Sequence, residues 1–308
     1  MRKIILTTIV VISACTVTSC RNTCQYKNRA EMIRMHMYDP SSKYVIVACH
    51  RGDWRNYPEN SIPAIESVIR MGADIMELDL KMTKDSVLVL SHDKTINRCT
   101  NGKGNVADYT YEELMKFCLR RAHGKIVDTL RIPTLREALQ VCKDRICVNV
   151  DQGYEYYDQV IAIAEELGVV DQILIKSNNP IELVEAKQKK YLHNLMYMPV
   201  INLQSKEGQN LFNCYLTSSA PIAYEICWSV SDGAFEKACR EIRHQGSKIW
   251  INTLYPSLCG GYGNDDDEAY QSGKPHDVYG KFLDLGVSMI QTDRPDLLID
   301  YLKSIGRH

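Results

Sequence analysis

Two pairs of polar residues early in the chain have the types and spacing to hold a cation and to move protons. His50 and Arg51 follow a short apolar run, and Glu77 and Asp79 lie two residues apart within the next one. Alternate residues of a β-strand point to the same face, so the two carboxylates should project side by side. Unpaired carboxylates are costly inside a protein, and a cation bound between them would offset that cost. The spacing therefore predicts a metal site.

A third carboxylate, Asp151, ends the apolar run 146–151 and is expected to complete this site. A ligand set made only of carboxylate oxygens suits a hard ion such as Mg²⁺ or Ca²⁺ better than Zn²⁺. Three carboxylates around one divalent ion leave a charge of about −1, so an anionic phosphodiester would still need Arg51 to neutralise it. The residues thus predict one divalent cation, with Arg51 on the phosphate.

Two histidines can supply proton transfers at this site. His50 precedes Arg51, and His92 follows a further β-rich run, 86–91. An imidazole titrates near neutrality, so one ring can deprotonate an attacking hydroxyl while the other protonates a leaving alkoxide. A lone histidine is more often a structural hydrogen-bonding residue. Two histidines with an arginine and paired carboxylates favour catalysis.

The elements that must position these residues alternate between β-rich apolar runs and helical patterns, which is typical of βα units around a parallel sheet. Eight runs are predicted to be strands: 44–49, 74–81, 146–151, 173–177, 195–201, 222–228, 248–253 and 287–291. Apolar residues at helical spacing predict helices over 61–71, 134–143, 157–167 and 234–245. The pattern predicts an α/β fold, a single (β/α)8 barrel over 44–308. The active site of such a barrel is built from the loops after the strands.

Two segments depart from this alternation, and both are expected to cover one end of the barrel. A small insertion, about 93–131, follows the second strand, and a long loop spans 254–280. The loop contains the acidic run 265–268. Its contiguous carboxylates lack the spacing of a ligand set and favour a solvated loop.

The N-terminus has the features of a targeting segment, with Arg2 and Lys3 before an apolar run and Cys20 after Val17-Thr18-Ser19. This ending resembles the lipobox of bacterial lipoproteins. Residues 1–20 are therefore predicted to be a lipoprotein signal peptide, with Cys20 lipidated and 21–43 as a linker. The run is too short for a comfortable transmembrane helix, and an ordinary cleaved signal is the alternative. Either way we expect an exported protein, and the lipobox further predicts that it is anchored by lipid in the bacterial cell envelope, in the periplasm or at the outer membrane.

The charge balance excludes one class of partner. The net charge is −1 and Lys and Arg are spread along the chain, so no basic face for nucleic acid is expected. The 12 cysteines mostly stand singly in apolar runs or predicted helices, and we interpret most as small buried hydrophobic residues. No protein partner is evident.

Taken together, these motifs resemble the glycerophosphodiester phosphodiesterase family. The shared pattern comprises His50-Arg51-Gly52, Pro58-Glu59-Asn60, Gly72-Ala73-Asp74 with Glu77-x-Asp79, His92-Asp93, Arg98 with Thr100-Asn101-Gly102, Ile132-Pro133-Thr134-Leu135 and Thr292-Asp293-Arg294-Pro295. It covers about residues 44–302 and is most specific in its first half.

The resemblance implies a role for each matching residue and a reaction. His50 and His92 would be the acid and base, and Arg51 would bind the phosphate. The metal ligands would be Glu77, Asp79 and Asp151. Glu59 would sit beside the site and orient its basic groups. Family members split a glycerophosphodiester into sn-glycerol 3-phosphate and an alcohol.

One position departs from the family pattern. The family usually has Glu-x-Lys at the third strand, where this chain has Asp151-Gln152-Gly153. Aspartate can still ligate a metal, but the phosphate-binding lysine is absent. We hypothesise that Lys176 partly replaces it and that Gln152 helps to bind substrate, with a structural lysine as the alternative. Trp250 is expected in an apolar wall for the glycerol or headgroup, with core packing as its alternative.

Three other functions fit parts of the pattern. A lysophospholipase D or an inositol-phospholipid phosphodiesterase would use a similar barrel and histidine pair. A non-catalytic surface lipoprotein that binds glycerophosphate would fit the missing lysine. A glycosidase would use paired carboxylates, but it gives no role to Arg51 and the two histidines.

Overall fold

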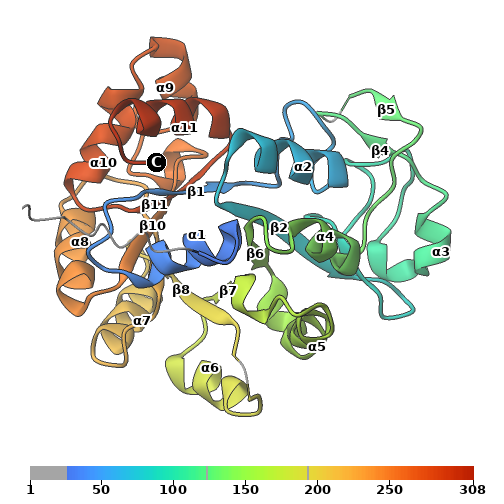
Figure 1. The fold of residues 1–308 in the computed structure, drawn as a ribbon, viewed down its shortest axis with the longest axis horizontal. Helices are drawn as coiled ribbons and strands as arrows, with labels where there is room; N and C mark the ends of the chain where they lie inside the picture. The colour runs from blue at the N-terminus through green and yellow to red at the C-terminus, as the bar shows by residue number, and fades with distance from the viewer. Residues whose placement is uncertain (1–25, 123, 193) are drawn as a thin grey trace, which may run out of the picture.

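A closed barrel of parallel strands forms the centre of the computed structural model, which describes residues 26–308 apart from 123 and 193. The strands are β1 (Ile46–Cys49), β2 (Ile75–Met82), β6 (Cys147–Asp151), β7 (Ile173–Ser177), β8 (Met196–Asn202), β9 (Ala223–Cys227), β10 (Lys248–Asn252) and β11 (Met289–Thr292). Each pairs in parallel with its neighbours, and β1 closes the ring by pairing with both β11 and β2 (Figure 1). The predicted barrel and its eight strands are confirmed.

Helices surround this barrel (Figure 1). They are α2 (Ile62–Met71), α4 (Leu135–Cys142), α5 (Tyr157–Leu167), α6 (Ile181–Gln188), α7 (Lys206–Leu216), α8 (Ala234–Gln245), α9 (Asp266–Ser272), α10 (Lys281–Asp284) and α11 (Pro295–Ser304). Local sequence sets their ends. Thr134 caps α4 in a reciprocal pair with Glu137. Gly72 ends α2 in the left-handed region, with φ 94°, where glycine has no steric penalty.

The barrel interior is apolar toward the N-terminal ends of the strands, and helix α1 (Arg29–Tyr38) closes that end. Ala30, Ile33 and Met37 of α1 are buried in one cluster with inward-facing residues of the barrel strands. Arg29 fixes the helix start through an ion pair of 3.1 Å with buried Asp74. The prediction of a linker over 21–43 is therefore wrong for 29–38, which form this helix. The helix has only three buried apolar residues, at i, i+3 and i+7, and so short a stripe gives a weak helical pattern in the sequence.

The insertion after β2 forms a small lobe at the side of the barrel (Figure 1). It begins with β3 (Leu88–Leu90), which pairs antiparallel with β2, and includes α3 (Tyr111–Leu114), β4 (Leu119–Arg120) and β5 (Ile126–Val127). Its buried residues make a separate cluster: Val89, Ile96, Val106, Leu114, Leu119 and Ile132. The lobe thus has its own core beside the strand ends of the barrel.

The predicted signal peptide and Cys20 lie outside the described residues. Within 26–308, gaps excepted, no helix is long and apolar enough to cross a membrane. The cysteines of this part are free thiols, and Cys49, Cys142, Cys147 and Cys239 are buried as small core residues.

Candidate active site

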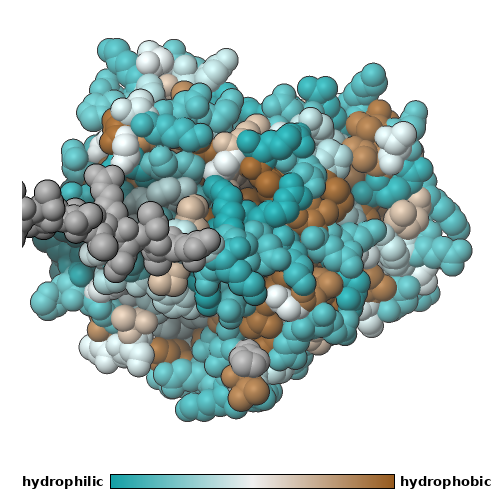
Figure 2. All heavy atoms as spheres, in the orientation of Figure 1, coloured by the Kyte–Doolittle hydropathy of each residue, from teal (hydrophilic) through white to brown (hydrophobic). Residues whose placement is uncertain are grey.

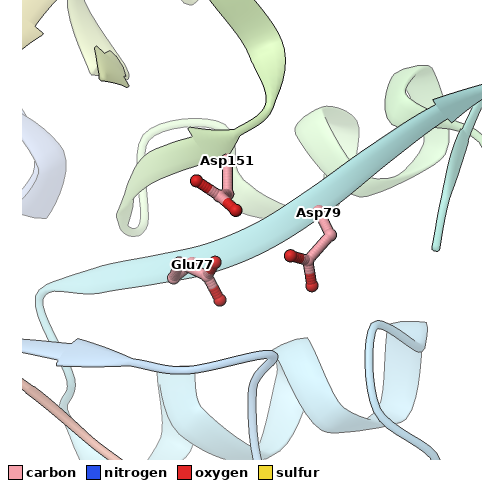
Figure 3. A group of neighbouring side chains, drawn as sticks. All are labelled: Glu77, Asp79 and Asp151. Atoms are coloured by element: carbon pink, nitrogen blue, oxygen red, sulfur yellow. The ribbon is translucent and has the colours of Figure 1, made fainter. Parts of the chain in front are cut away.

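Three carboxylates converge inside the barrel where β2 and β6 end. Glu77 and Asp79 come from β2 and Asp151 from β6, with Asp79 opposite Asp151 in the strand register. Each offers an oxygen within 4.8 Å of the others, and Figure 3 shows the three side chains gathered on one side of the strands. Glu77 and Asp79 are buried. The structure therefore brings together the three predicted metal ligands.

The electrostatics of this group fit a bound divalent cation. Burial raises the pKa of Glu77 well above its usual value, and the charges of Asp79 and Asp151 raise it further. A cation would remove this penalty by compensating the like charges at close range. The donors are all oxygens, as a hard ion such as Mg²⁺ or Ca²⁺ requires.

Arg51 sits at the edge of this group in a constrained turn. Its φ is 54°, and Gly52 follows at φ 74°, where a Cβ would lie 3.0 Å from the Ala64 Cβ. The turn lets the Arg51 N–H donate to Glu77 Oε2 at 2.8 Å. The guanidinium lies 3.4 Å from Asp79 Oδ2 and 3.4 Å from Glu59 Oε1. Glu59 thus lies beside the site, as the resemblance implied.

Each candidate catalytic histidine is held by a carboxylate at Nδ1. His50 Nδ1 lies 2.8 Å from Asp293 Oδ1, and His92 Nδ1 lies 2.7 Å from Asp93 Oδ1. An ionised carboxylate only accepts, so each ring carries its proton on Nδ1 and leaves Nε2 free to take or give a proton. Asp93 is fixed in turn by Arg98, whose hydrogen bonds hold the pKa of Asp93 well below its usual value.

His92 also lies close enough to the carboxylates to influence one of them. Burial acts to raise the pKa of Asp151, but the charges of Lys176 and His92 bring it below its usual value. The two histidines, Arg51 and the three acids therefore belong to one end of the barrel.

Asp293 is a site residue that the sequence prediction missed. The resemblance included Thr292-Asp293 without giving Asp293 a role, and Asp293 does not cap the helix that follows, because α11 is preceded by Arg294 and has no side-chain cap. Asp293 Oδ1 instead accepts from the Trp54 Nε1–H at 2.6 Å and holds His50. The topology of the predicted barrel could have indicated this role, because the last strand of a closed barrel lies beside the first.

The acidic run 265–268 was interpreted as solvated, and this is wrong for Asp265, which is 7% exposed, and above all for Asp266, which is 1% exposed. Its Oδ2 accepts from the backbone N–H of Asp293 at 2.7 Å and from the hydroxyl of Thr292 at 2.9 Å. Its Oδ1 accepts from the hydroxyls of Thr253 and Tyr279. Burial raises the pKa of Asp266 to about 7, against the effect of these hydrogen bonds. Asp266 thus supports the turn that carries Asp293.

Lys176 reaches the site but is already paired. Its Nζ lies 3.0 Å from Glu225 Oε2 and 3.5 Å from Asp151 Oδ1. Burial lowers the pKa of Lys176, yet Glu225, Asp151 and Glu77 together raise it above its usual value. Glu225, a charged residue within the otherwise apolar strand β9, is a second site residue that the sequence prediction missed. The alternative of a structural lysine therefore has geometric support.

A different lysine, Lys81, reaches from β2 to Gln152 beside the departure from the family pattern. Lys81 follows Asp79 by two residues on the same face of β2. Its Nζ donates to Gln152 Oε1, so Gln152 contacts a lysine side chain beside the site. Gly153 has no room for a side chain, since a Cβ there would lie 2.8 Å from Val150 and Ile175. The sequence feature that could have identified Lys81 as a site residue is its position two residues after Asp79 on the same strand.

Trp250 lies outside the site. Its side chain is fully buried in the cluster under α1, and its Nε1–H donates to Asn252 at 2.9 Å. It therefore cannot form a wall against a substrate, and core packing is its role. Inward residues early in a strand face the closed end of the barrel, whereas those at its end face the site.

A (β/α)8 barrel with two aspartate-held histidines, three clustered carboxylates and an arginine at its strand ends has the architecture of phosphodiesterase-type barrels. The model of the glycerophosphoryl diester phosphodiesterase family matches residues 50–207, about half of the chain. The chain therefore belongs to this family. A model described as a domain of unknown function matches residues 197–302.

Individual relatives agree with this placement. A glycerophosphodiester phosphodiesterase of Caldanaerobacter subterraneus is 35% identical over 150 residues, which cover 46% of this chain and 62% of that protein. The match spans less than two thirds of the length of such curated relatives.

Solved structures show the same fold. A crystal structure of a glycerophosphoryl diester phosphodiesterase from Parabacteroides distasonis has a TM-score of 0.70 and 23% identity, covering 91% of this chain and 93% of that one. An Oleispira antarctica phosphodiesterase, solved in complex with the product sn-glycerol 3-phosphate, has a TM-score of 0.60 and 20% identity, covering 86% and 99%.

Proposed function

We propose that this protein hydrolyses glycerophosphodiesters to sn-glycerol 3-phosphate and an alcohol, with a divalent cation and with His50 and His92 as acid and base. The observation that carries the proposal is the convergence of Glu77, Asp79 and Asp151 within 4.8 Å, beside two histidines that each present Nε2. The phosphodiesterase activity of the curated relatives and the product bound by the Oleispira protein support the same reaction.

The side chains divide the work of hydrolysis. One imidazole Nε2 takes the proton of the attacking hydroxyl as a new P–O bond forms. The other gives its proton to the leaving alkoxide oxygen as the old P–O bond breaks. Glu77, Asp79 and Asp151 would hold the cation, which when bound would act as a Lewis acid on phosphoryl oxygen.

Three carboxylates and an anionic phosphodiester carry more negative charge than one divalent ion can neutralise. Cationic side chains are therefore needed at the phosphate in addition to the metal. Arg51 lies at the rim of the carboxylate group, and its Nε makes no hydrogen bond within the described part of the chain. Lys81 is half-buried and bonded through Nζ to a neutral amide and a carbonyl, so its charge is not neutralised by an ion pair. Lys176, unlike Lys81, forms ion pairs with two carboxylates, and one of these, with Glu225 at 3.0 Å, is shorter than either of the 3.4 Å pairs of Arg51. We assign Arg51 and Lys81 to the phosphate and Lys176 to the support of Asp151.

Release of sn-glycerol 3-phosphate from glycerophosphocholine tests the proposal. Excess chelator should abolish it, and Mg²⁺, Ca²⁺ or Mn²⁺ should restore it. His50→Ala and His92→Ala should each lower kcat by about 10²–10⁴-fold with an unchanged circular dichroism spectrum. Full activity in chelator would remove the metal from the proposal.

The same assay separates the rival functions. Faster turnover of micellar lysolipid than of soluble diester would favour a lysophospholipase D. Binding of glycerophosphocholine without turnover, under every metal, would favour a non-catalytic binding protein.

We also propose that the protein is exported and anchored through Cys20. The lipobox-like ending of the N-terminal apolar run supports this. Cells expressing the chain should incorporate labelled palmitate into it, and Cys20→Ala should abolish the label. Label retained in that variant would contradict the assignment of Cys20.

A further inference from the structure

A basic cavity of about 660 Å³ lies at the end of the barrel opposite the candidate active site. It is lined by residues just before β1, β10 and β11, by the last turns of α8, by the end of α10 and by the C-terminal tail. The charged residues in its lining are Lys43, Arg240, Arg243, Lys248, Arg307 and Asp284, together with His244. Figure 2 shows a mostly hydrophilic surface on the face that carries α1.

The cavity gathers cations that are not held in ion pairs. None of its five lysines and arginines makes an ion pair with a residue in the described part of the chain, and Asp284 is the only carboxylate in its lining. Elsewhere arginines such as Arg29, Arg98 and Arg145 are paired. The fold therefore concentrates positive charge that the sequence spreads over more than 260 positions, from Lys43 to Arg307. A site of this kind attracts anions.

Lys248 is the strongest sign of a ligand. It is 5% exposed, and its ammonium makes no hydrogen bond or ion pair with any described residue. Burial lowers the pKa of Lys248, and only Asp39 acts in the opposite direction. The side chain of Lys248 is thus largely enclosed while its ammonium has no protein partner, and an anion in the cavity would supply one.

Arg243 is positioned by a glycine. A Cβ at Gly286 would lie 2.5 Å from Arg243 Cδ and 2.9 Å from its Nε, so the arginine stem packs directly on the Gly286 backbone. Gly286 has φ 93°, in the left-handed region. The placement of this guanidinium at the cavity thus depends on the absence of a side chain at 286.

We propose that this cavity is a second anion site that binds a phosphate group, carried either by a free phosphate compound or by the headgroup of an anionic phospholipid. Arginine and lysine are the residues that recognise phosphate oxygens, and five of them face one volume here. The site is separate from the carboxylate group, which stands on β2 and β6 toward the other end of the barrel.

Calorimetric titration of the full chain tests the proposal with three probes: inorganic phosphate, monomeric dihexanoylphosphatidylglycerol and dihexanoylphosphatidylcholine. Arg51→Gln in every sample suppresses phosphate binding at the candidate active site. Arg240→Gln with Arg243→Gln should weaken binding of the preferred anionic probe by about tenfold or more, since two charge-assisted contacts to the phosphate oxygens are lost. Both arginines are exposed, so folding should persist.

Matched variants sharpen the result. Lys237→Gln removes an exposed cation from the same helix that does not line the cavity, and it should leave affinity unchanged. Gly286→Ala alters no charge and should still weaken binding by displacing Arg243. Tighter binding of phosphate identifies a soluble ligand, and tighter binding of the glycerol lipid identifies a membrane headgroup.

Two outcomes would overturn the proposal. One is equal affinity of the parent and the double-arginine variant for both anionic probes. The other is equal affinity of the zwitterionic and anionic lipids. With Arg51 restored, the double-arginine variant should hydrolyse diesters normally, so failure of the hydrolase proposal and failure of this one are distinguishable.

Discussion

At the scale of single residues, the two imidazoles are supported differently. His92 depends on Asp93, which Arg98 holds directly, and both lie in the insertion lobe. His50 depends on Asp293, whose backbone N–H is bound by buried Asp266. A carboxylate from the long loop thus lies behind one candidate catalytic group.

Asp266 should make stability depend on pH. Its pKa is raised to about 7 in the folded protein, above the value near 4 of an unfolded aspartate. The folded state therefore binds this proton more tightly, and the stability so gained is full below about pH 4 and is lost as pH rises to about 7. The difference in unfolding free energy between the parent and Asp266→Asn should fall over that window, by at most about 1.4 kcal/mol per pH unit.

Urea unfolding at several pH values measures this difference, because other titrating groups cancel between parent and variant. Asp267→Asn, next in the chain but more than half exposed, is the matched control and should show no such trend. A difference independent of pH in Asp266→Asn would show that this carboxyl titrates normally.

The two lysines near the carboxylates should respond differently to substitution. Lys81→Met should raise KM for glycerophosphocholine several-fold with little loss of stability, because it removes a phosphate contact. Lys176→Met should destabilise the fold by about 3–5 kcal/mol, since it leaves Glu225 and Asp151 unpaired in a buried setting.

Steady-state kinetics and urea unfolding of both variants check this, with exposed Lys84→Met as control. If Lys81→Met has a normal KM while Lys176→Met raises it without loss of stability, the earlier hypothesis for Lys176 is correct and the assignment to Lys81 is wrong.

At the scale of elements, α1 is expected to act as part of the core. Ile33 is fully buried among barrel residues, so Ile33→Ala should lower the unfolding free energy by about 2–5 kcal/mol. Met35 lies on the same helix but is 45% exposed, and Met35→Ala should change it by less than about 0.5 kcal/mol. Equal effects of the two would mean that α1 is only loosely attached.

The strands were predictable and α1 was not, for a physical reason. A barrel strand is covered on both faces, so its apolar run is continuous, as in 44–49, and stands out in the sequence. Helix α1 contributes a narrow stripe whose partners lie up to 259 positions away, such as Met289 against Ala30. These partners come together only when the barrel closes, so the sequence around α1 does not show that its apolar stripe will be buried.

The candidate site was predictable where chemistry dictates residue spacing. Glu77 and Asp79 share a face because strands have a period of two. Asp266 was not predictable, because its neighbours in the acidic run are also carboxylates and only tertiary contacts select the one that supports Asp293. Asp293 required knowledge of which strand end lies beside His50.

At the scale of the whole molecule, the cation should couple to folding. Three carboxylates that repel one another in the folded barrel are separated in the unfolded chain, so an ion that binds only the folded form stabilises it. Metal at about 100 times its Kd should add about 2.7 kcal/mol to the unfolding free energy. Thermal unfolding with Mg²⁺ or Ca²⁺ against chelator measures this, and Asp79→Asn should abolish the shift. Identical curves for the parent would argue against a resident ion.

The plug formed by α1 also orients the molecule. The N-terminal helix α1 lies at the closed end of the barrel. His50, His92 and the carboxylates lie at the other end, a strand length of roughly 15 Å away. If the lipid on Cys20 is embedded in a bilayer, the short segment between Cys20 and α1 would keep the closed end of the barrel toward the lipid. The end that carries the candidate active site would then face water. Such a protein would meet deacylated diesters dissolved in the surrounding compartment more readily than lipids in the leaflet that holds it.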